Sequence, residues 1–71
     1  MNAKETIRES LKKIMNDGDA NACAIWKGYD NGTGRIGWHV VKFGETATYY
    51  GKSVEEVIEV IDDIYDSRES A

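Results

Sequence analysis

The residues of this sequence that could do the most distinctive chemistry are carboxylates gathered on one predicted helix. In SVEEVIEVIDDIYD, residues 53–66, the polar side of the helix is acidic from its first turn to its last, through Glu55, Glu59, Asp62, Asp63 and Asp66. Like charges four residues apart repel by about 0.2–0.5 kcal/mol per pair, and acids at a helix C-terminus oppose its dipole. This face is either a solvated surface or the contact for another protein with a basic surface. Lysines in place of Asp62 and Asp66 are expected to raise stability.

A second set of candidate residues follows the predicted strands. Strand alternation, with Lys42 nearby, gathers aromatic and basic side chains on the open face of the sheet: Arg35, His39, Phe43, Tyr50 and Lys42. Such side chains can stack on and hold RNA or another single-stranded nucleic acid. The same face could be an ordinary solvent-facing sheet, or an apolar patch through which a homodimer or another partner binds.

The sequence contains only incomplete catalytic and metal-binding patterns. The single cysteine, Cys23, and the single histidine, His39, lie on adjacent predicted strands and form a nucleophile–base pair only if they share a face. Asp17, Asp19 and Asn21 match the opening spacing of a calcium loop, but the glycine required at its sixth position is absent. We therefore predict a non-enzymatic adaptor or inhibitor-like binding module without catalytic residues, metal or cofactor.

Composition narrows the class of protein further. The 71 residues carry a net charge of −4 and include 41% hydrophobic and 31% charged residues, which is typical of one globular domain, residues 1–71. An acidic chain is disfavoured as a ligand of duplex nucleic acid. No apolar run approaches the length of a membrane span, and one cysteine fits a reducing compartment, so we expect a cytoplasmic protein.

Periodicity and capping signals define the elements that must position these residues. We predict a helix over 2–16, strands over 22–29, 35–43 and 46–50, a helix over 54–66 and a short C-terminal tail. Asn2 with Glu5 and Ser53 with Glu56 are typical N-terminal caps, and Gly18 suits a helix stop. The order predicts an α+β fold, α-β-β-β-α, in which two helices pack on one face of a three-stranded antiparallel meander.

The strand register is predicted from the turns. A two-residue turn at Gly44-Glu45 pairs Val40 with Tyr49, and it turns the following side chains toward the helices: Ile36, Trp38, Val40, Ala47 and Tyr49. The first strand has two alternatives. A five-residue loop after it turns Ala22, Ala24 and Trp26 inward, whereas a four-residue loop turns Cys23 and Ile25 inward.

Two resemblances accompany this interpretation. The element order resembles that of double-stranded RNA-binding domains, although the stretch matching their basic patch is here SVEEVIEV, which repels phosphate. The segment ATYYGKSVEEVIEVIDDI, residues 47–64, is similar to the strand-and-helix motif of HicB-like antitoxins.

Overall fold

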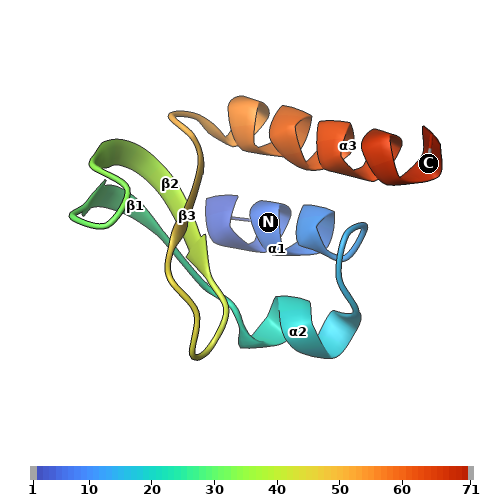
Figure 1. Ribbon diagram of the computed structural model, residues 1–71, viewed down its shortest axis with the longest axis horizontal. Coiled ribbons are helices and arrows are strands. Elements are labelled where there is room, and N and C mark those ends of the chain that lie inside the picture. The colour runs from blue at the N-terminus through green and yellow to red at the C-terminus, as the bar shows by residue number, and fades with distance from the viewer. Residues whose placement is uncertain (1, 71) are drawn as a thin grey trace.

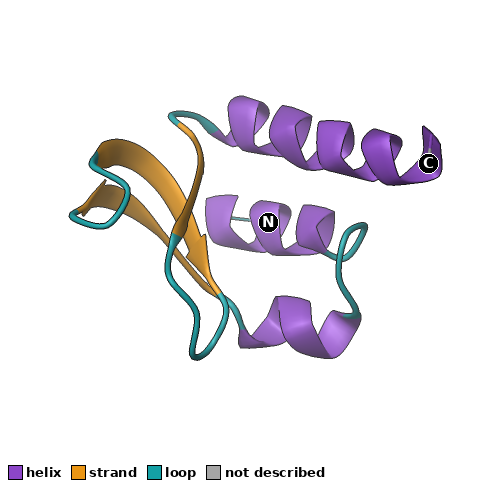
Figure 2. Ribbon diagram, viewed as in Figure 1, coloured by secondary structure: helices purple, strands orange, loops and turns teal. Residues whose placement is uncertain are grey.

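The computed structural model describes residues 2–70, with side chains as far as residue 68. The elements are α1 (Ala3–Leu11), α2 (Asp17–Ala22), β1 (Ala24–Asp30), β2 (Arg35–Val41), β3 (Thr48–Gly51) and α3 (Val54–Ser70). The strands form an antiparallel sheet in the order β1-β2-β3, and the helices lie to one side of it (Figures 1 and 2). The predicted α+β fold is therefore confirmed, with one short helix, α2, that the sequence did not reveal.

One apolar core joins the helices to the inner face of the sheet. Its buried side chains come from α1, the turn after it, α2, the sheet and α3: Ile7, Leu11, Ile14, Ala20, Cys23, Ile25, Trp38, Val40, Val57 and Ile61. Trp38 is 8% exposed, as its predicted inward orientation requires. Each large aliphatic side chain buried in this way contributes roughly 1.5–3 kcal/mol relative to exposure.

The first predicted helix, 2–16, is wrong in its second half. The Asn2 cap is present, since its side-chain oxygen accepts the Glu5 N–H at 2.9 Å, but α1 ends at Leu11. The chain then turns, and the side chain of Asn16 accepts the Asp19 N–H at 2.7 Å and starts α2. Asn16 therefore begins a helix and does not end one, because a side-chain acceptor competes with helical continuation.

Arg8 holds α2 against α1. Its guanidinium donates to the carbonyl oxygens of Ala20, Asn21 and Cys23, at 2.7, 3.2 and 3.0 Å. A cation is favourable at a helix C-terminus, and here it comes from a neighbouring helix because α2 has no base in its last turn. A helix of six residues, too short to be stable alone, is thereby fixed by a tertiary contact.

The β1–β2 hairpin follows the four-residue alternative. Asp30 pairs with Arg35 across the loop, and the register continues to the pair Ala24–Val41 without interruption. Gly34, at φ +68°, closes the loop in a conformation that favours glycine. Cys23 and Ile25 are therefore buried on the helix side, whereas Trp26 lies on the outer face.

The predicted register of the β2–β3 hairpin is wrong by one residue. Val40 pairs with Thr48 and not with Tyr49. The Glu45 N–H donates to the Lys42 carbonyl at 2.9 Å, which makes Gly44, at φ +83°, the third residue of the turn and not its second. A slip of one residue exchanges the faces of a strand. Tyr50 therefore packs on the core, and Tyr49 turns outward.

A bulge and two glycines complete β3. The pairs His39–Tyr49 and Trp38–Gly51 leave Tyr50 as an extra residue. A Cβ atom on Gly37 would lie 2.6 Å from the Gly51 carbonyl oxygen, and both glycines have positive φ, 153° and 156°. Only glycine permits strands β2 and β3 to meet in this way.

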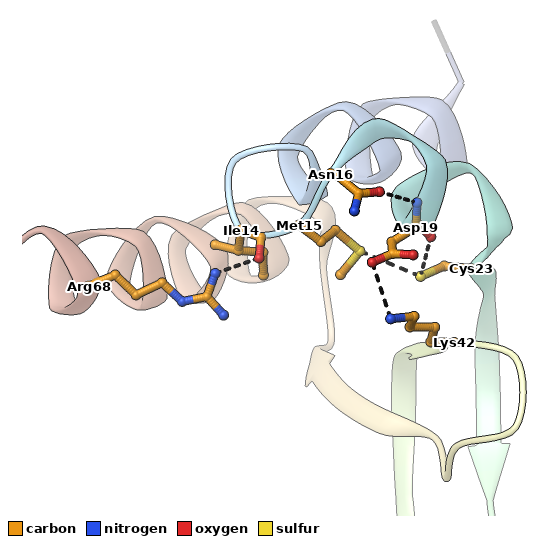
Figure 3. Close-up of polar contacts among 7 residues, drawn as sticks. All are labelled: Ile14, Met15, Asn16, Asp19, Cys23, Lys42 and Arg68. Carbon is orange, nitrogen blue, oxygen red and sulfur yellow. Dashed lines mark hydrogen bonds and ion pairs between the residues drawn. The ribbon is translucent and has the colours of Figure 1, made fainter.

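The last helix is longer than the predicted 54–66. It runs to Ser70, so most of the predicted tail is helical, and residue 71 lies outside the described residues. No Gly or Pro interrupts the chain after Asp66. The Arg68 guanidinium donates to the Ile14 carbonyl in the turn after α1, which ties the end of α3 to the core (Figure 3).

Candidate functional site

The acidic residues of α3 have different surroundings. Glu56 completes the predicted capping box: its N–H donates to the Ser53 hydroxyl at 3.2 Å, and its carboxylate accepts the Lys52 N–H at 3.0 Å. Asp62 accepts a hydrogen bond from the Lys13 ammonium at 2.8 Å. These two carboxylates are therefore already used to begin the helix and to bind it to the chain after α1.

The contact with Asp62 changes the pKa of Lys13. The hydrogen bond that Lys13 donates to Asp62, and then the charge of the same carboxylate, raise the pKa of Lys13. Asp66 adds a smaller effect in the same direction, so it too lies within electrostatic reach of the ammonium. The expectation that Lys at position 62 would stabilise the helix is revised, because the new ammonium would face Lys13.

Three carboxylates form a separate row, which we call the acidic row: Glu55, Glu59 and Asp63. They are spaced i, i+4 and i+8, so they succeed one another along one side of α3, and all three are exposed. No ion pair or hydrogen bond joins them to another described residue. Glu55 and Glu59, and Glu59 and Asp63, therefore repel each other by about 0.2–0.5 kcal/mol per pair, and no ion pair with a described basic side chain offsets this repulsion.

An apolar residue borders this row. Val60, which follows Glu59 in the sequence, remains 36% exposed. The predicted binding residues of this helix did not include it, because all of them are carboxylates. The helix therefore presents a row of carboxylates with one partly exposed apolar side chain beside it.

Of the residues of the alternative nucleic-acid surface, Arg35 and His39 lie near each other, because both contact the Tyr49 ring. Arg35 is exposed and lies over the Tyr49 ring at 5.2 Å from its centroid. His39 is 0% exposed and Tyr50 packs on the core. Phe43 is 93% exposed on the β2–β3 turn. These four predicted residues thus occupy different environments on the molecule.

Lys42, the fifth residue of that set, is held by α2. Its ammonium lies 3.1 Å from a carboxylate oxygen of Asp19, an ion pair that Figure 3 shows beside Cys23. This hydrogen bond, together with the charge of Asp19, raises the pKa of Lys42. The pair ties the β2–β3 connection to α2 and leaves Lys42 less available to an external phosphate.

The outer face of the sheet instead carries a packed aromatic cluster. The His39 ring stacks on Trp26, with centroids 5.3 Å apart, and meets Tyr49 edge to face at 5.5 Å. Its Nδ1 donates to the Gly37 carbonyl at 3.0 Å, and the Thr33 hydroxyl lies 2.7 Å from Nε2. A carbonyl can only accept, so in the neutral ring Nε2 accepts from Thr33. His39 is thus a fully hydrogen-bonded part of the fold.

Cys23 and His39 do not form a pair. The Cys23 thiol contacts the Met15 sulfur at 3.7 Å and the Asp19 carbonyl at 3.3 Å, on the helix side of the sheet. His39 lies on the opposite face. Burial raises the pKa of Cys23, which lowers its thiolate fraction and its reactivity. The nucleophile–base reading of these two residues is therefore wrong.

The calcium-loop spacing has a structural explanation. Asp17, Asp19 and Asn21 lie in α2, where acids suit the first turn, and not in a loop. Within residues 2–70, no group of three or more His, Cys, Asp or Glu side chains is placed to hold a metal ion, and no pocket is found. None of the helices in this part of the chain is long and apolar enough to cross a membrane.

No protein-family model, curated protein or solved structure was found to match this chain.

Proposed function

We propose that this protein is a non-enzymatic binding module that captures a basic surface of another protein through the acidic row of α3. The observation that carries the proposal is the separation of the acidic residues into two kinds. Glu56 and Asp62 have partners inside the fold. Glu55, Glu59 and Asp63 are exposed and pair with no other described residue, although they repel one another.

The energetics favour an external role for the row. Repulsion within it would be removed by one lysine in place of Glu59, which makes the row a surface maintained at a small cost to folding. A basic partner would neutralise the three charges together, and complementary charge accelerates the encounter of two proteins. The border at Val60 would add apolar contact once the partner is bound.

The first test is a titration of the labelled protein with a tetralysine peptide, followed by backbone amide NMR. We expect shifts concentrated at residues 55–63 and declining as salt screens the charges. The variant E55Q/E59Q/D63N should lose most of this response. The matched control D62N removes a carboxylate that is already paired with Lys13, so this variant should retain the response to the peptide. Equal losses in the two variants would overturn the assignment of the row.

The second test asks for the natural partner. Capture from a native lysate, with and without nuclease, should recover a basic protein with the wild type and less of it with the triple variant. Capture that disappears after nuclease treatment would favour the alternative, single-stranded nucleic acid on the outer face, where Arg35 and Tyr49 stack.

A further inference from the structure

The two edges of the sheet are not equally protected. β3 has four residues, contains the bulge at Tyr50 and leads directly into α3. Short and bulged edges resist pairing with other chains. β1 has seven residues, pairs with β2 without a bulge and has no other strand beside it in residues 2–70. Its outer backbone groups are therefore a template for another strand.

An apolar pair lies beside this open edge. Tyr29 and Ile36 are cross-strand partners, 59% and 68% exposed. They share the inner face with Ile25 and Val40, but they lie toward the closing loop of the hairpin, which projects beyond the helices at the left of Figure 1. Within residues 2–70, no helix covers this end of the inner face, which leaves both side chains exposed.

The sequence of β1, AIWKGYD, can pair with itself. In an antiparallel sheet, residues that lie directly opposite each other point to the same face. If the two β1 strands are related by a two-fold axis, one residue must therefore lie opposite its own copy, and the axis passes between the two. An axis at Lys27 sets two ammonium groups directly opposite, which is unfavourable. An axis at Trp26 sets Lys27 opposite the buried Ile25. An axis at Gly28 avoids both conflicts.

The Gly28 axis also uses the exposed residues. It places Lys27 opposite the Tyr29 of a second copy, and Tyr29 opposite that copy's Lys27, where an ammonium can lie over an aromatic ring. The smallest residue then sits at the axis. α3 packs on the β3 side of the sheet, so both acidic rows would stay exposed in such a pair.

We propose that two copies of this chain associate through the free edge of β1, antiparallel and with the two-fold axis at Gly28, to form a six-stranded sheet. This association does not involve the acidic row, and it uses the edge of the sheet and not its open face.

Sedimentation across a range of protein concentrations tests the association. We expect a monomer–dimer equilibrium in the wild type. Y29K places two ammonium groups opposite each other on both sides of the axis and should weaken dimerisation by at least about 10-fold. The control F43K changes a more exposed side chain remote from this edge and should leave the equilibrium unchanged. A wild type that remains monomeric at every concentration, or a dimer sensitive only to F43K, overturns the proposal.

Cross-linking tests the position of the axis. A Cβ atom at Gly28 would meet only Trp26, at an ordinary 3.8 Å, so cysteine fits there without strain. Opposed Cα atoms about 4.5–5.5 Å apart suit a disulfide, so G28C should form a covalent dimer with diamide as oxidant. In the control I36C, the two cysteines are separated by three strand spacings, at least about 14 Å, and should not cross-link. Cross-linking of I36C but not G28C would refute this register.

Discussion

The two hairpins share strand β2 but differ in what fixes their register. β1–β2 pairs from Ala24 to Asp30 without interruption, and its loop is bound to the sheet through Thr33 and His39. β2–β3 contains a bulge and a longer connection, residues 42–47, and is fixed by glycine contacts and by helix packing. The sequence restricted the first hairpin to two registers, and the length of its loop selected one of them. For the second hairpin, the register predicted from the turn was wrong, because packing and glycine contacts shifted it by one residue.

The cross-strand glycines Gly28 and Gly37 give the largest expected contrast between the hairpins. A Cβ at Gly37 would lie 2.6 Å from the Gly51 carbonyl oxygen, at φ 153°, so G37A should cost about 3 kcal/mol. Its partner in the regular hairpin has free space, and G28A should be neutral or stabilising by up to about 1 kcal/mol. Urea unfolding measures both. Similar losses in the two variants would contradict the close approach of β2 and β3.

Removal of the Thr33 hydroxyl should lower the free energy of unfolding by less than G37A does, but by a measurable amount. T33V leaves the buried Nε2 of His39 without its hydrogen bond, and we expect a loss of about 1–2 kcal/mol. The matched change in the second connection, T46V, alters an exposed threonine and should cost less than about 0.5 kcal/mol. If the two variants unfolded at the same urea concentration, the loop of the first hairpin would not be held by His39.

Alkaline pH tests which tyrosine of β3 faces the core. Burial raises the pKa of Tyr50, so the folded state favours the neutral phenol. This stability is fully present below the ordinary tyrosine pKa of about 10 and is lost as pH rises through the higher folded value. Y50F should therefore reduce the alkaline decline in unfolding midpoint, whereas Y49F should retain it. The opposite result would restore the predicted register.

The ion pair between Lys42 and Asp19 should give the smallest effect, because exposed pairs are weak. D19N should lower the thermal midpoint slightly more than D17N, which removes an unpaired acid from the same helical turn. The difference should vanish near 0.5 M salt, where the Debye length is only about 4 Å. If the midpoints of D19N and D17N still differed at high salt, Asp19 would stabilise the fold through an interaction that is not electrostatic.

The features that depend on neighbouring residues could be predicted before the structure was known. The caps at Asn2 and Ser53, the apolar period of both long helices and the glycine-rich loop before Arg35 act within a few residues, so propensity and hydrogen bonding specify them locally. The acidic face of α3 was also readable, because its spacing follows directly from helical geometry.

The remaining features depend on contacts between segments that are distant in the sequence. Asp62 meets Lys13 across 49 positions of sequence, and this contact separates the acidic row from the paired carboxylates. Arg8 of α1 anchors α2, and the β3 register depends on glycines that let Gly51 approach Gly37. Each of these outcomes requires two distant segments to meet, and the free energy of that contact outweighs local preferences of a few tenths of a kcal/mol per residue.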